Sequence, residues 1–288
     1  MMNKSRESQD FPVEEILSTD GQLVDMETVQ EFIEQTLENV DLAELREIEA
    51  ELIKKGERLS ELLAKDAIPD LTDENLIHIL KVVFATRRRA KQILENVGAK
   101  AFKDAIHELL YSPNDLESRF ETFVQTMTAY FEDVRVLRPK KSLASRAAES
   151  AEKAALQENV FCDLGSELLH FIDPNQYWLW TRWMWDPHAG TGALPLVTVE
   201  DITLYGDNVG KTYMKVGMAI TFIKETGNAA GFANFGTTAY NIDVFMACVY
   251  AVYMYTTLRL RMTQEFNKVI PELPELTRRL LGVWKMEL

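Results

Sequence analysis

The sequence predicts a mainly α-helical protein, with an acidic N-terminal helical hairpin or bundle followed by a C-terminal helical domain that holds at most a short extended segment. Apolar residues recur at intervals of three and four along most of the chain, which is the spacing of one helix face. Ser, Thr, Asp or Asn precedes several of these runs, and Gly or Pro follows them. Of the 288 residues, 47% are hydrophobic and 26% are charged, so the chain can build a core without disulfides.

The elements expected along the chain divide it into three parts. Residues 1–24 are predicted to form a flexible polar arm, residues 25–138 an acidic helical region, and residues 139–288 a C-terminal helical domain containing a tryptophan cluster. Helices are expected over residues 25–37, 41–65, 72–98, 99–111 and 114–131, over 142–156 with a continuation or restart over 160–171, and over 212–224, 243–258 and 275–281. An extended segment is expected over 194–199. Candidate N-caps are Asp25 or Thr28, Thr72, and Asn114 or Asp115.

The negative charge is concentrated in the first quarter of the chain. The net charge is −14, and residues 1–70 hold nineteen acidic and seven basic residues, whereas the remainder is nearly neutral. An acidic segment repels polyphosphates and anionic lipid surfaces, so nucleic acid is disfavoured as a partner. Either the segment is a solvated helix face or it docks to a basic protein.

The main basic cluster is Arg87-Arg-Arg89, with Lys81 and Lys91 nearby. On a helix, three consecutive arginines point in different directions, so at least one is expected to turn inward or to meet a partner. The sequence favours pairing with the acidic N-terminal helices, and contact with nucleic acid is the alternative.

Several features favour a cytoplasmic protein with no membrane span. The longest apolar run, from Val244 to Leu258, contains three tyrosines and falls short of the ~20 residues that span a bilayer. We expect it to be a buried core helix. The first ten residues lack the apolar stretch of a secretion signal. Cys162 and Cys248 lie in apolar contexts outside any metal or redox pattern, which predicts buried, reduced thiols and no metal or cofactor.

Four of the five tryptophans fall within eight residues: Trp178, Trp180, Trp183 and Trp185. Each indole buries about 200 Å² and needs a partner for its N–H. The spacing does not place the four on one helix face. The cluster therefore predicts either a core that joins the two halves of the chain or a platform for a ligand or partner.

Polar residues near the tryptophans extend the second possibility to a binding site. Arg182 lies between tryptophans, where a guanidinium can stack on a ring or capture an anion. Asp186 and His188 follow on a predicted turn, and Lys211 offers a further cation. By contrast, His170 lies in an apolar run and is expected to be a hydrogen-bonded core histidine.

Known catalytic and metal-binding motifs find no complete match. The sequence contains no HExxH, no GxSxG and no Cys/His ligand set. The segment Gly206-Asp-Asn-Val-Gly-Lys-Thr212 differs from a phosphate-binding loop, because three residues instead of four separate its glycines. It is expected to be a turn before a helix, whose N-terminus can still attract an anion.

Two segments, residues 166–177 and 204–212, resemble parts of the helix-hairpin-helix DNA glycosylases. Ser166-Glu-Leu-Leu-His-Phe-Ile-Asp-Pro-Asn-Gln-Tyr177 is similar to a turn in such helical domains, and Leu204-Tyr-Gly-Asp-Asn-Val-Gly-Lys-Thr212 is similar to their hairpin. Together they cover less than a quarter of the chain, and the Leu-Pro-Gly-Val-Gly form of the hairpin is absent. The resemblance implies a helical topology, with Lys211 and Asp243 at the positions of the catalytic lysine and aspartate.

These observations favour a non-enzymatic protein that acts through protein–protein contacts, as an adaptor or as a subunit of a homo- or hetero-oligomer. The alternative is a helical domain, either an enzyme or a binding module, that binds nucleic acid or a phosphorylated ligand. Its site would comprise Trp178, Trp180, Arg182, Trp183, Trp185, Asp186, His188 and Lys211.

Overall fold

The computed structural model describes residues 23–132, 143–200, 202–261 and 271–286. The chain is 70% helical, with eleven α-helices and no sheet in the described residues, which confirms the predicted mainly α fold. The helices are α1 (Met26–Asn39), α2 (Leu42–Leu62), α3 (Asp73–Val82), α4 (Ala90–Val97), α5 (Ala99–Tyr111), α6 (Leu116–Glu132), α7 (Leu143–Ile172), α8 (Leu194–Val197), α9 (Val209–Ala230), α10 (Asn241–Arg261) and α11 (Leu273–Leu280). Three short 3-10 helices are η2 (Ile68–Asp70), η3 (Arg87–Arg89) and η5 (Phe232–Asn234).

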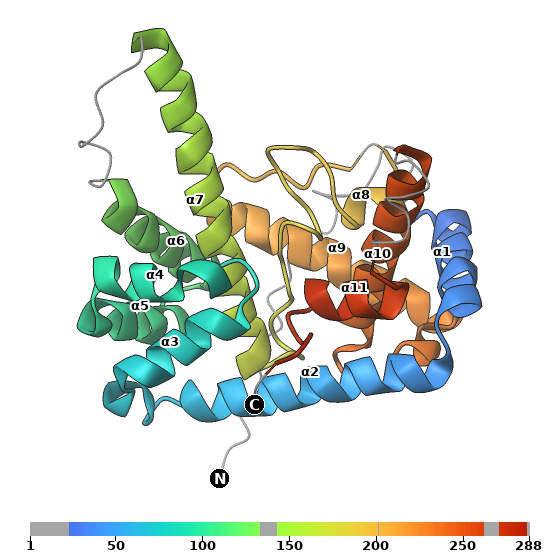
Figure 1. Ribbon diagram of the computed structural model, residues 1–288, viewed down its shortest axis with the longest axis horizontal. Helices are drawn as coiled ribbons and strands as arrows, with labels where there is room; N and C mark the ends of the chain where they lie inside the picture. Colours follow the sequence, from blue (N-terminus) through green and yellow to red (C-terminus); the bar gives the residue numbers. More distant parts are fainter. Residues whose placement is uncertain (1–22, 133–142, 201, 262–270, 287–288) are drawn as a thin grey trace.

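Helix α7 runs through the middle of the molecule (Figure 1). Helices α3 to α6 lie on one side of it, and α1 and α8 to α11 lie on the other. Helix α2 passes along one edge and connects the two sides. One hydrophobic cluster extends from Leu23 to Val283, with α1 packed on α10 and α2 packed on α7. The acidic helices therefore share a core with the C-terminal helices.

Several helices begin where the sequence predicts. The side chains of Asp25, Thr72 and Asp115 each accept a hydrogen bond from the backbone N–H three residues later, which confirms them as N-caps. Such a cap satisfies a donor that the helix itself leaves unpaired. Because this interaction is local, the sequence alone indicates it.

The single helix predicted over 72–98 is wrong. Helix α3 ends at Val82, η3 follows, and α4 starts at Ala90. The Thr86 hydroxyl donates to the Leu80 carbonyl oxygen at 2.6 Å and replaces the bond that a continuing helix would make. The chain therefore turns sharply between α3 and α4, and the three arginines lie on this turn.

The extended segment predicted over 194–199 is wrong for its first four residues, which form α8. A proline in the first turn of α8 suits a helix start because its missing N–H would be unpaired there. Thr198 is extended and forms an isolated bridge with Val24. Leu23 is buried and accepts a hydrogen bond from the backbone of Val199.

Apart from Leu23 and Val24, the predicted arm lies outside the described residues. The boundary predicted at residue 138 also lies outside the described residues.

Candidate functional site

The tryptophan cluster lies in a segment without regular helix that connects α7 to α8. Trp180, Trp183 and Trp185 are 3%, 8% and 3% exposed, and Trp178 is half-buried. The indole N–H of Trp178 donates to the Tyr213 carbonyl oxygen at 2.8 Å, and that of Trp180 donates to the Trp185 carbonyl oxygen at 3.0 Å. These contacts satisfy the polar edges of two rings inside the fold.

The rings of this segment connect α6 to α9. Tyr213 of α9 stacks on Phe120 of α6 with ring centroids 4.2 Å apart, and Trp178 lies 5.1 Å from Tyr213. A Cβ on Gly217 of α9 would meet the Trp178 ring at 1.6 Å, so the indole packs directly on the helix backbone. This packing favours the first of the two hypotheses for the cluster, a core that joins the halves of the chain.

Arg182 is partly exposed and bound to a buried carboxylate. Its backbone N–H donates to Asp163 Oδ1 at 3.0 Å, and its Nε donates to Oδ2 at 3.2 Å. Burial raises the pKa of Asp163 to about 7, although the charge and hydrogen bonds of Arg182 oppose the increase. The guanidinium is thus engaged within the fold.

This raised pKa predicts a pH-dependent stability. Because folded Asp163 holds its proton more tightly than the unfolded chain does, the free energy of unfolding should fall as pH rises from about 4 to about 7. Asp163→Asn removes this titration and keeps an oxygen for the Arg182 N–H. Urea unfolding between about pH 5 and pH 8 should show a flatter profile for the variant. Parallel profiles would contradict the assignment.

Asp186 and His188 shape a turn at the surface. The Asp186 carboxylate accepts the backbone N–H of His188 at 2.9 Å, and it also accepts that of Ala189 at 3.3 Å. The Tyr205 hydroxyl donates to the Pro187 carbonyl oxygen at 2.6 Å. His188 is exposed and lies outside the packed tryptophan rings.

Lys211 lies in the first turn of α9, close to carboxylates. Its ammonium is 3.8 Å from Asp207, and its backbone N–H donates to the side chain of Asn208, the N-cap. The Asn208 amide donates to Glu117 at 3.0 Å. A capped helix start flanked by carboxylates is unfavourable for an anion. The structure thus groups Trp178, Trp180 and Trp185, and it gives Arg182, His188 and Lys211 separate surroundings.

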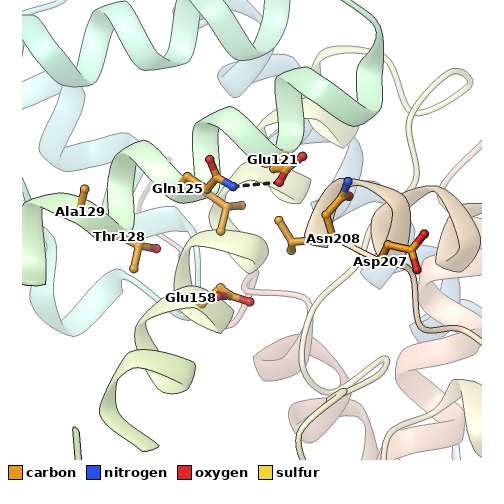
Figure 2. Close-up of a pocket in the computed structure, with 9 residues that line it drawn as sticks. Glu121, Gln125, Thr128, Ala129, Glu158, Asp207 and Asn208 are labelled. Carbon is orange, nitrogen blue, oxygen red and sulfur yellow. Dashed lines mark hydrogen bonds between the residues drawn. The ribbon is translucent and has the colours of Figure 1, made fainter. Parts of the chain in front are cut away.

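A groove of about 500 Å³ opens between α6, α7 and the start of α9 (Figure 2). Its carboxylates are Glu121, Glu158 and Asp207, and Glu121 accepts a hydrogen bond from Gln125 at 2.8 Å. Its described lining includes no lysine, arginine or histidine. This charge disfavours a phosphate ligand in the groove.

Two buried ionic contacts on α7 were not predicted from the sequence. Lys55 Nζ of α2 lies 2.6 Å from Glu167, with the side chains 1% and 5% exposed. His170, which the sequence places in the core, binds the Tyr177 carbonyl oxygen through Nδ1 and Asp243 through Nε2, both at 2.9 Å. Polar residues repeat at helical spacing along one face of α7. This repeat is the only sign of the buried contacts that the sequence of α7 offers.

The turn between α3 and α4 forms a basic, partly aromatic surface, which we name the basic elbow: Lys81, Phe84, Arg87, Arg88, Arg89 and Lys91. Phe84 is 53% exposed, and all the cations except the partly buried Arg87 are exposed. Arg87 donates to the carbonyl oxygens of Lys81 at 3.1 Å and Gly282 at 3.3 Å. Within the described residues, no carboxylate pairs with these cations, so the predicted pairing with the acidic helices is wrong.

No protein-family model, curated protein or solved structure matches the chain. Among the described residues, no group of three candidate ligands is positioned to hold a metal ion, and no helix is long and apolar enough to cross a membrane. Of the two positions that the glycosylase resemblance indicates, Asp243 is 1% exposed and faces His170. Its carboxylate is therefore shielded from any nucleotide at the surface.

Proposed function

We propose that the protein is a non-enzymatic, cytoplasmic helical protein that acts through contacts with other protein subunits, as an adaptor or as a subunit of an assembly. The observation that carries this proposal is the basic elbow, where a phenylalanine is 53% exposed among lysines and arginines. Aromatic and arginine side chains are enriched at the centres of protein interfaces. Because an exposed ring buries less apolar area than a core ring, it contributes less to the stability of the fold.

The alternative, a nucleic-acid or phosphate site at the tryptophan cluster, has weaker support. Three of the four indoles are buried, and Arg182 is bound to Asp163. The net charge of −14 also opposes a polyanionic partner. The elbow itself is basic, so nucleic acid recovered with the protein is also measured in the test below.

Removal of the elbow side chains should abolish partner capture. Immobilised wild-type protein is compared with the variant Phe84→Ala/Arg88→Ala/Arg89→Ala in a lysate of the native host, and recovered proteins are quantified by mass spectrometry. A partner in near-stoichiometric amount should be recovered by the wild type and reduced about tenfold or more by the variant.

The control variant, Lys54→Ala/Lys100→Ala, also removes two exposed positive charges, neither of which belongs to the elbow. It should recover the partner as the wild type does. Equal recovery by the elbow variant would contradict the proposal, as would recovery of nucleic acid without a protein partner.

A further inference from the structure

Helix α1 presents a continuous line of glutamates, which we name the acidic stripe: Glu27, Glu31, Glu34 and Glu38. Their spacing of four, three and four residues places them on one face of the helix, and all four are exposed. Like charges at this spacing destabilise a helix. Helix α1 contains no lysine or arginine that would offset the repulsion.

Exposed leucines lie beside the acidic stripe. Leu37 follows Glu34 by three residues, so the two side chains are neighbours on the helix, and it is 36% exposed. Leu42, just past the turn into α2, is 51% exposed. The corner between α1 and α2 thus combines apolar surface with negative charge, whereas the basic elbow combines apolar surface with positive charge.

Within one copy of the chain, the acidic stripe and the basic elbow do not meet. In Figure 1, α1 lies at one end of the molecule and α3 and α4 lie toward the other. In the part of the chain that the structure describes, no ion pair joins a glutamate of the stripe to a basic residue. Both surfaces therefore keep their charge and apolar area available for another molecule.

We propose that the partner of the basic elbow is a second copy of this chain, bound through its acidic stripe, with Phe84 of one copy packed against Leu37 and Leu42 of the other. The inference rests on the proposed function and names its partner. Charge complementarity carries the argument: the stripe supplies four exposed carboxylates, and the elbow supplies four exposed cations.

The contact joins two different surfaces, so an open assembly keeps one free stripe at one end and one free elbow at the other. Such a heterologous contact produces a ring when its rotation closes, a reciprocal dimer in the smallest case, or a chain when it does not. Because exposed ion pairs are screened by salt, the association should weaken at high ionic strength.

Sedimentation velocity of the wild-type protein tests this proposal. At about 0.05 M salt, the average mass should increase with concentration, and at about 0.5 M salt the apparent affinity should fall about tenfold or more. Each of the variants Arg88→Glu/Arg89→Glu and Glu34→Lys/Glu38→Lys should remain monomeric where the wild type associates. The control Lys54→Glu/Lys100→Glu changes the net charge as the elbow variant does and should associate normally.

Mixing the two reversed variants gives the decisive result. One variant retains a functional stripe and the other a functional elbow, so an equimolar mixture should associate under conditions in which neither variant associates alone. A wild-type protein that stays monomeric up to about 0.1 mM, or a mixture that stays monomeric, would overturn the second copy as partner. If the elbow-dependent capture described above persists in that case, the proposed function stands with a different partner; if capture also fails, both proposals fall.

Discussion

Replacing Glu167 with glutamine is expected to lower the free energy of unfolding by about 3–5 kcal/mol. The substitution preserves volume but removes the charge that balances Lys55. The Lys55 ammonium would keep a hydrogen bond to the Leu281 carbonyl oxygen at 3.0 Å and the face of the Phe171 ring at 4.6 Å. Neither contact compensates fully for the free-energy cost of a buried ammonium without a counter-charge. Urea unfolding followed by circular dichroism measures the loss.

Two controls separate the lost charge pair from general damage. Glu61→Gln breaks an exposed pair, Arg58 with Glu61 at 3.4 Å, and should leave stability unchanged within error. Replacing both buried partners, Lys55→Met with Glu167→Leu, should recover most of the stability, because no charge is then left unpaired. A Glu167→Gln variant as stable as Glu61→Gln would show that this buried pair contributes nothing.

The sequence predicts helix starts well because their causes are local. The side chains of Asp25 and Thr72 each accept a hydrogen bond from the backbone N–H three residues later, so no distant contact is required. The break between α3 and α4 has a less evident local cause, since the apolar spacing continues across it. The Thr86 hydroxyl and the packing of neighbouring helices determine where α3 ends. The intrinsic helix propensity of the residues that follow is too weak to extend the helix past this point.

The buried polar residues of α7 show where sequence reasoning fails. Asn159, Asp163, Ser166, Glu167 and His170 are all buried, yet their helical spacing is typical of a solvent-exposed face. Their partners come from residues distant in the chain, such as Lys55 and Asp243. A sequence gives no distance between α7 and those partners. For the tryptophans, the same lack of distances left both a core and a binding platform open.

The second large effect concerns Asp243→Asn and should depend on pH. Both ring nitrogens of His170 contact oxygen atoms, so the charged imidazolium can donate to the Tyr177 carbonyl and the Asp243 carboxylate together. Burial lowers the pKa of His170, but the charge and hydrogen bond of Asp243 outweigh it and raise the pKa above 6.5. In the wild type, the resulting stability is present below about pH 6.5 and is lost as pH rises through the higher pKa of the folded state.

In the Asp243→Asn variant, burial is left as the larger influence and the pKa of His170 should fall below its ordinary value, so the sign of the pH dependence reverses. The variant should be about 3–5 kcal/mol less stable than the wild type near pH 5.5, with a smaller difference near pH 8.5. Urea unfolding of both proteins across this range measures the difference, and subtraction removes the titration of Asp163, which both share. A difference that stays constant with pH would mean that His170 is neutral in the wild type, and the contact with Asp243 would then be a hydrogen bond between a neutral ring and a carboxylate.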